Sequence, residues 1–272
     1  MKRHQVETQG RRQLGRHRLR GSIQIFVVVI VLATMLKMFV VDAVHIPSRS
    51  MENTLLAGDF VLVSKLVSGM RIPAQYSFAR TGFPLFSLPG VQGVERGDIV
   101  VFTLPLDESE QKSVYFVKRC VALAGDMVHI QDGYLYVNGQ LVRNYRNQET
   151  DFGPITAPKQ GDIVRLNETM YAELSTFIHR EGHTIHRTIS SGFLIDGKPA
   201  THYRVEKDYC FVLGDNLSES YDSRSWGFLP VEYVIGKAII VYWSMDPSLE
   251  KGISTIPSSI RWDRIGTLLI SQ

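Results

Sequence analysis

Three short segments of the sequence carry side chains whose types could perform chemistry. They supply hydroxyl, amine, carboxylate and guanidinium groups, on Ser48, Ser50, Lys118, Ser220, Asp222 and Arg224. In residues 46–55 the serines follow a proline, a pattern typical of a turn or a helix cap. In residues 115–119 the lysine lies within an apolar run, where desolvating its charge is costly, so such a lysine usually points to solvent. Residues 214–227 are typical of a polar loop between strands, so each segment taken singly has an ordinary structural explanation.

Other groupings of reactive side chains do not predict a metal or nucleotide site. His179, His183 and His186 are spaced as ligands on a helix would be, but their segment has no helical apolar face, so we expect no bound metal. Cys120 and Cys210 each lie in a predicted core strand, where free buried thiols are favoured over a disulfide and both states remain open. Because no glycine-rich phosphate loop precedes a helix, we expect no cofactor.

The charge of the chain is concentrated at its N-terminus. The 272 residues include 30 Lys and Arg against 27 Asp and Glu, for a net charge of +3. Seven of the basic residues and one acidic residue fall within residues 1–22, so this arm carries +6 and the remainder −3. Nucleic-acid binding requires positive charge on the folded surface, so we expect no nucleic-acid partner.

An apolar segment follows the basic arm. Ile25 to Val41 is interrupted only by Thr34 and Lys37, and the run reaches 19 residues if it starts at Ile23. A helix of that length spans roughly 28 Å, close to the thickness of a bilayer core. We therefore predict a transmembrane helix over residues 23–43, in contact with the lipid bilayer of the inner (plasma) membrane, with residues 1–22 cytoplasmic and the rest on the outer side.

A cleavable signal peptide is the alternative, since residues 41–43 have small residues where such a peptide is cut. The basic region and the apolar run are longer than is typical of one, which favours an anchor.

The chain after residue 43 has the pattern of a mostly β protein. Short runs rich in Val, Ile, Phe and Tyr predict strands over Asp59–Val67, Asp98–Leu104, Tyr115–Ala124, Tyr209–Leu213 and Val234–Trp243. Asp132-Gly133 and Asn138-Gly139 predict consecutive hairpins between residues 127 and 142, and Asp196-Gly197 predicts a later one. Residues 143–205 are polar and irregular, so we interpret them as an insertion between core strands.

Residues 68–97 are rich in glycine and proline, which predicts a long loop or extended hairpin. The loop carries apolar side chains that could either enter a bilayer interface or cover the core: Phe78, Phe83, Leu85, Phe86 and Leu88.

The three polar segments, in this order behind an N-terminal anchor, resemble those of type I signal peptidase, the membrane-bound leader peptidase. The resemblance extends from the apolar segment through residues 48–67, 96–142 and 209–242 to residues 260–266. The family has glycine at the position of Arg49 and proline at that of Asn53, and it usually has proline at that of Ala124. Arg49 is the departure that matters, because it places a charged side chain beside the serine.

The resemblance implies a Ser–Lys dyad with Ser50 as nucleophile and Lys118 as general base. An ordinary lysine, with a pKa near 10.4, is neutral only about 0.04% of the time at pH 7, so burial must lower this pKa. The apolar neighbours of Lys118 provide such burial, and a lysine can be tuned in this way where an arginine cannot.

The same resemblance implies roles for the remaining site residues. Ser48 and the backbone N–H of Ser50 would form the oxyanion hole, and Ser220 would orient the lysine. Asp222 and Arg224 would form a supporting ion pair. Shallow pockets for small residues before the cut would be lined by Ile46, Pro47, Met51, Leu55, Phe116 and Val117.

The fold class that these observations predict is mostly β. Its catalytic core of coiled antiparallel sheet is built from residues 44–142 and 206–272, with the smaller subdomain of residues 143–205 inserted and one N-terminal transmembrane helix preceding it. The function implied by the resemblance is a serine endopeptidase that removes signal peptides from secreted preproteins. Two alternatives stay open: another Ser–Lys protease of this core fold, and an inactive relative that acts as a membrane-tethered binding module.

Overall fold

A computed structural model describes residues 24–37, 40–67, 93–104, 115–145, 150–168, 171–188, 192–249 and 256–270. Over these residues the chain is mostly β, and every strand pair is antiparallel. The fold class predicted for the body of the chain is therefore confirmed.

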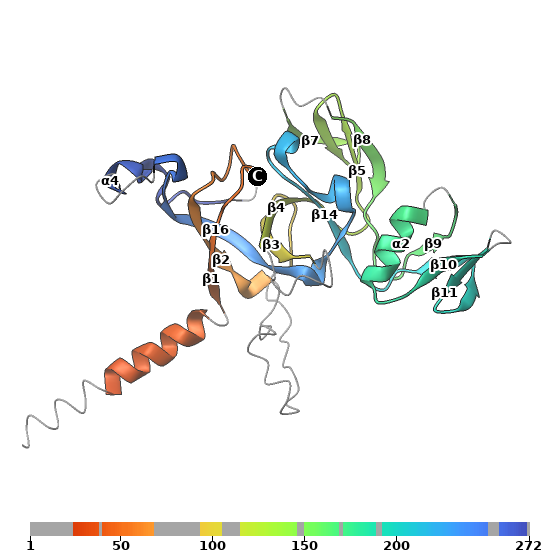
Figure 1. The fold of residues 1–272 in the computed structure, drawn as a ribbon, viewed down its shortest axis with the longest axis horizontal. Coiled ribbons are helices and arrows are strands. Elements are labelled where there is room, and N and C mark those ends of the chain that lie inside the picture. The colour runs from red at the N-terminus through yellow and green to blue at the C-terminus, as the bar shows by residue number, and fades with distance from the viewer. Residues whose placement is uncertain are drawn as a thin grey trace, which may run out of the picture.

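The main sheet positions the three polar segments. In the described residues it contains β1 (Val41–His45), β2 (Asp59–Ser64), β3 (Ile99–Thr103), β4 (Tyr115–Ala122), β14 (Tyr209–Leu213), β15 (Leu229–Pro230) and β16 (Val234–Ser244). Their order across the sheet is β1-β2-β16-β3-β4-β14-β15, so a late strand returns between two early ones (Figure 1). All five strands predicted from the apolar runs are present, and β14 has the predicted bounds.

A second sheet follows β4 in the chain. It has the order β7-β6-β5-β8 and contains β5 (Met127–Gln131), β6 (Tyr134–Val137), β7 (Gln140–Asn144) and β8 (Phe152–Thr156). Asp132 and Asn138 have φ angles of 52° and 53°, and the glycine after each is also left-handed, as two-residue hairpin turns require. The two hairpins predicted here are confirmed.

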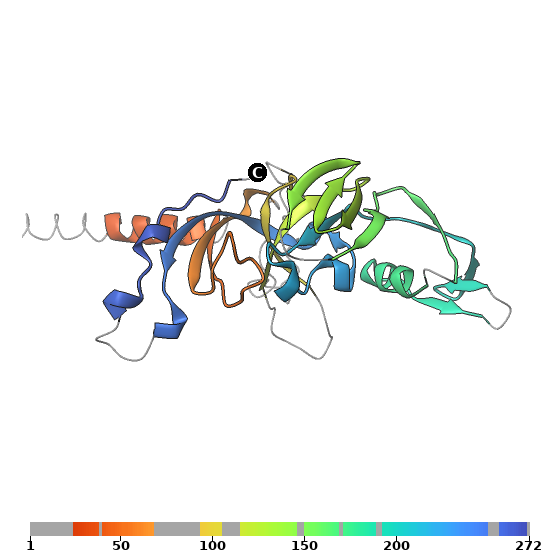
Figure 2. The same cartoon turned by 90° about the horizontal axis from the view of Figure 1, so that it is seen from above.

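Residues 143–205 are more ordered than their composition indicates. Beyond β8, they contain β9 (Ile163–Arg165), α2 (Tyr171–Arg180), β10 (Ile185–Arg187), β11 (Phe193–Ile195), β12 (Lys198–Ala200) and β13 (His202–Arg204). The prediction of an irregular segment without a helical apolar face was wrong, because Leu174, Phe177 and Ile178 form a narrow buried stripe on an otherwise polar helix. The hairpin at Asp196-Gly197 is confirmed as β11–β12. β8 pairs with β5, so this part of residues 143–205 belongs to the second sheet. The part around α2 lies at the end of the body opposite the N-terminal helix (Figures 1 and 2).

The remaining helices are short. They are α3 (Ser223–Trp226) and α4 (Ile256–Ser259), together with 3₁₀ turns at Lys65–Val67, Leu217–Glu219, Val231–Tyr233, Pro247–Leu249 and Trp262–Arg264.

The N-terminal apolar segment forms a helix over residues 24–37 that extends away from the β body (Figures 1 and 2). Its large apolar side chains are exposed on all sides, with Ile30 the least exposed at 48%. Among the described residues, no helix has both the length and the apolar character needed to cross a membrane. Residues 41–43, which were predicted to end the transmembrane helix, instead lie in β1 and pair with residues 62–64 of β2, because Val41 to His45 can satisfy its backbone groups in the sheet. The basic arm and the apolar side chains of residues 78–88 lie outside the described residues.

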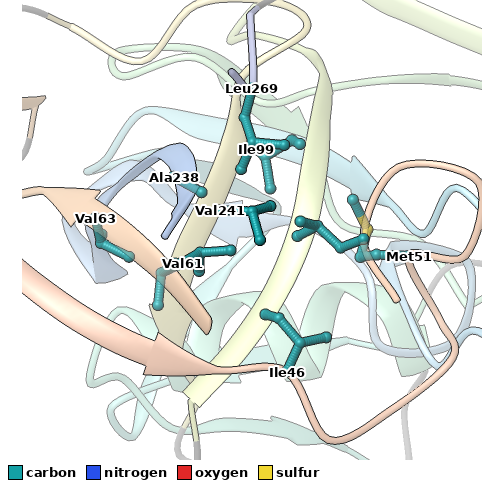
Figure 3. Close-up of a cluster of buried hydrophobic side chains, with 10 residues drawn as sticks. Ile46, Met51, Val61, Val63, Ile99, Ala238, Val241 and Leu269 are labelled. Carbon is teal, nitrogen blue, oxygen red and sulfur yellow. The ribbon is translucent and has the colours of Figure 1, made fainter. Parts of the chain in front are cut away.

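A buried cluster lies beneath the first polar segment (Figure 3). Ile46 and Met51, from the loop between β1 and β2, pack with sheet residues such as Val61 and Val241. The loop is thus fixed on the sheet by apolar contacts at both ends of its serine-containing stretch.

Candidate active site

Ser50 and Lys118 lie side by side although 68 positions separate them in the chain. Ser50 belongs to the loop between β1 and β2, and Lys118 lies on β4 opposite Val100 of β3. Their side chains are in hydrogen-bond contact, with Lys118 Nζ 2.6 Å from Ser50 Oγ. Both residues are buried, with 6% and 4% of their surface exposed.

Burial changes the acid–base chemistry of Lys118. Desolvation lowers the pKa of its ammonium group from 10.5 to about 8, and the negative charges of Asp222 and Asp215 oppose this shift. At pH 7 about 9% of such a lysine is neutral, which is roughly two hundred times the fraction of an ordinary lysine. The amine can therefore accept a proton from the adjacent hydroxyl near neutral pH.

Ser48 lies on the solvent side of this pair. Its Oγ is 3.3 Å from Ser50 Oγ, and the residue is exposed. The hydroxyl is thus beside the nucleophile, where an incoming carbonyl would approach.

The segment after β14 packs directly against the serine. The backbone N–H of Asn216 donates to the carbonyl of Ser50 at 3.0 Å. A Cβ added to Gly214 would come within 3.0 Å of the Ser50 carbonyl and of the Ser220 side chain, so only glycine fits there. The sequence marks Gly214 only as the first residue of the third polar segment, and sequence reasoning gave it no role.

Asp215 is the centre of a buried ion-pair network that was not predicted. Arg119 donates to both of its carboxylate oxygens, at 2.9 and 2.7 Å, and also to the carbonyl of Gly97. Arg143 of β7 donates to the same carboxylate at 2.6 Å, and Thr54 of the serine loop donates to it at 2.5 Å. The network joins the serine loop, β4, the second sheet and the loop after β14. The one feature of the sequence that indicates this network is an arginine directly after Lys118 in an apolar strand.

Asp222 and Arg224 form the ion pair implied by the resemblance, with Nε 2.8 Å from Oδ1. Asp222 also caps α3 and accepts a hydrogen bond from the N–H of Gly214. Arg224 donates to the carbonyl of Leu217, so the pair fixes the loop that packs on Ser50.

Ser220 does not contact the lysine in the way the resemblance implies. Its Oγ is buried and, among the described residues, has no hydrogen-bond partner. The side chain instead packs close to Gly214, which places it next to Ser50.

The six residues expected to line substrate pockets lie in two environments. Ile46, Met51 and Leu55 are 2% exposed or less and belong to the apolar cluster of Figure 3. The other three reach the surface, since Pro47 is exposed and Phe116 and Val117 are half-buried.

The histidines and cysteines contribute no catalytic grouping within the described part of the chain. No three His, Cys, Asp or Glu side chains there are placed to hold a metal ion. His183 lies between Asp196 and Glu206, at 2.6 and 3.1 Å, and its hydrogen bond to the carboxylate of Asp196 is the main cause that raises its pKa. Cys120 and Cys210 are both buried and free.

Comparison with known proteins identifies relatives over most of the chain. A sequence model of the family described as "Signal peptidase, peptidase S26" matches residues 19–243. A signal peptidase I of Buchnera aphidicola is 29% identical over 258 residues, covering 86% of this chain and 76% of the relative. A signal peptidase I of Aquifex aeolicus is 29% identical, covering 83% and 85%. A probable signal peptidase I-2 of Synechocystis is 30% identical, covering 80% and 70%.

A crystal structure of a signal peptidase I from Enterococcus faecalis also matches, at 21% identity. The match covers 54% of this chain and 97% of that one, and its TM-score of 0.31 is too low to carry a structural argument.

Proposed function

Because the chain belongs to the signal peptidase family, peptidase S26, we propose that it is a membrane-anchored serine endopeptidase that cuts signal peptides from exported preproteins with a Ser50–Lys118 dyad. The observation that carries the proposal is the 2.6 Å contact between two buried side chains, one a hydroxyl and the other an amine of lowered pKa. No metal or cofactor is required for this chemistry, because a neutral lysine is itself the base.

The reaction begins when neutral Lys118 takes the proton from Ser50 Oγ and the oxygen attacks the scissile carbonyl. The carbonyl oxygen becomes negatively charged and accepts hydrogen bonds from Ser48 Oγ and the N–H of Ser50. The ammonium of Lys118 then protonates the leaving amine as the C–N bond breaks, which leaves an acyl-enzyme on Ser50. Water, deprotonated by the same lysine, attacks the ester and releases the signal peptide.

The loop after β14 holds the nucleophile in place. Asn216 binds the backbone of Ser50, while the Asp222–Arg224 pair and the Asp215 network fix the loop itself. We assign these residues positioning roles, and we assign Ser220 the role of filling the space beside Gly214.

The substrate residues before the cut would be small and apolar. Pro47, Phe116 and Val117 are partly exposed and would form the walls, and the buried Ile46, Met51 and Leu55, against which Val117 packs, would form the floor. Shallow apolar walls of this kind accommodate short side chains and exclude long or charged ones.

The apolar segment before β1 would anchor the enzyme in the plasma membrane, with the basic arm in the cytoplasm and the β body on the outer side. Two observations support this anchor: apolar side chains are exposed all around the helix of residues 24–37, and residues 1–22 carry a positive charge. Residues 40–50 link the helix directly to Ser50, so the dyad would stay close to the bilayer surface, where a membrane-inserted signal peptide presents its cleavage site.

Incubation of the purified protein with a preprotein tests this function, with the products read by mass spectrometry. We expect one cut after a short apolar residue at the end of the signal peptide. An intact preprotein after prolonged incubation would contradict the proposal and favour a binding module, whereas cutting at unrelated sites would indicate a different Ser–Lys protease.

A further inference from the structure

Arg49 carries an exposed positive charge next to the nucleophile in the chain. It immediately precedes Ser50, yet its side chain is 64% exposed whereas Ser50 is buried. Its backbone is fixed, because its carbonyl accepts hydrogen bonds from the N–H of Glu52 at 2.9 Å and from Nδ2 of Asn216 at 3.3 Å. The guanidinium can therefore move in solvent but cannot leave the neighbourhood of the nucleophile.

The other arginines around the site have close acidic partners. Arg224 is paired with Asp222, and Arg119 and Arg143 both bind Asp215. Arg49 lies 3.7 Å from Glu52, in a pair that is exposed on both sides and is therefore weak. Glu219, in the facing loop, is a second exposed carboxylate.

No other lysine or arginine occurs in the serine loop, residues 46–58, or in the facing loop, residues 214–222. Within these two loops, Arg49 thus supplies the one basic side chain near a substrate bound to Ser50.

We propose that Arg49 gives the enzyme a charge preference for the start of the released protein, favouring acidic and disfavouring basic residues directly after the cut. The inference rests on the proposed function and adds a specificity-determining residue to it. The pockets proposed for residues before the cut are apolar and shallow, so we place the charged substrate side chain that meets Arg49 after the scissile bond.

The size of the preference follows from Coulomb's law. We take a separation of about 7 Å, roughly the length of an arginine side chain, between the guanidinium and a charge on the first residue after the cut. At a water-like dielectric constant this separation changes binding by about 2- to 3-fold per charge, and by about 5- to 10-fold between Asp and Lys. The effect should fade when about 0.5 M salt shortens the screening length well below this distance.

Three peptides test the proposal, identical except for Asp, Asn or Lys at the first position after the cut. The kcat/KM of each is measured at low salt for the unmodified enzyme and for Arg49→Gln, Arg49→Glu and the control Glu52→Gln. We expect an Asp-to-Lys ratio of about 5 to 10 for the unmodified enzyme. The ratio should fall to near one in Arg49→Gln, drop below one in Arg49→Glu and rise in Glu52→Gln. The Asn peptide gives the uncharged reference rate of each enzyme, so any change in the Lys118 pKa caused by the altered charge affects all three peptides alike and cancels in the Asp-to-Lys ratio.

Two results would overturn the inference. An Asp-to-Lys ratio near one in the unmodified enzyme, or a ratio that Arg49→Gln leaves unchanged, would show that Arg49 does not select substrate charge. Cleavage of the Asn peptide would still support the proposed function in that case. If the unmodified enzyme cuts none of the three peptides, the proposed function itself fails and the inference fails with it.

Discussion

Activity should follow the titration of Lys118, because only the neutral amine can accept the serine proton. Desolvation lowers its pKa to about 8, so the neutral fraction is about 1% at pH 6, half at pH 8 and about 90% at pH 9. The kcat/KM should therefore rise about 90-fold between pH 6 and pH 9 and level off above that. A solvent-exposed lysine would instead give a continuous rise to pH 10 without a plateau.

The assay is the kcat/KM of a fluorogenic signal-sequence peptide from pH 5.5 to pH 10, with circular dichroism at each pH to confirm that the fold persists. Asp222→Asn should move the inflection to lower pH, because the charge of Asp222 raises the lysine pKa. Asp246→Asn is the control, since Asp246 is not among the charges that act on Lys118. A profile that is flat from pH 6 to pH 9, or one that still rises at pH 10 without a plateau, would refute the assignment of a buried lysine base.

Three further changes test separate parts of the site and its anchor. Ser48→Ala should lower kcat by roughly 10²–10³-fold with little change in KM, because one oxyanion donor is lost; a change confined to KM would assign Ser48 to substrate binding instead. Gly214→Ala should lower the melting temperature and the activity, at a cost of about 1–3 kcal/mol for overpacking against Ser50 and Ser220, whereas the control Gly93→Ala, with open space around it, should do neither. Deletion of residues 1–39, which keeps β1, should leave peptide cleavage intact and slow the processing of preproteins inserted in vesicles; equal rates in vesicles would show that the apolar segment does not aid access.

The strands were predictable because their signal is local. Runs of β-branched and aromatic residues identify β2, β3, β4, β14 and β16, and Asp-Gly or Asn-Gly pairs require the left-handed turns seen between β5 and β7. Helix α2 was missed because Leu174, Phe177 and Ile178, which are buried, lie in a segment whose composition is mostly polar. The end of the apolar segment was misplaced because valine favours both an apolar helix and a strand, and pairing with β2 decides between them.

The site was predictable only in part. Ser50 and Lys118 could be proposed from motifs that resemble a known family, whereas their contact depends on the packing of the serine loop against β4. Arg119 was the one local signal of the arrangement around Gly214 and Asp215. The rest depends on Arg143 from the second sheet and on Ser50 approaching from a distant loop. Nor could the sequence predict that Lys118 Nζ binds Ser50 Oγ while Ser220 Oγ has no hydrogen-bond partner in the described part of the chain.

The central claim is that Ser50 and Lys118 act as one catalytic unit. Single-turnover cleavage of a preprotein by Ser50→Ala, Lys118→Ala, Lys118→Arg and the double alanine variant tests it most directly, with folding checked by circular dichroism. The account predicts that all four variants are inactive and that the double variant is no worse than either single one, because removal of either member disables the pair. Substantial cleavage by any single variant, or additive losses in the double variant, would contradict it.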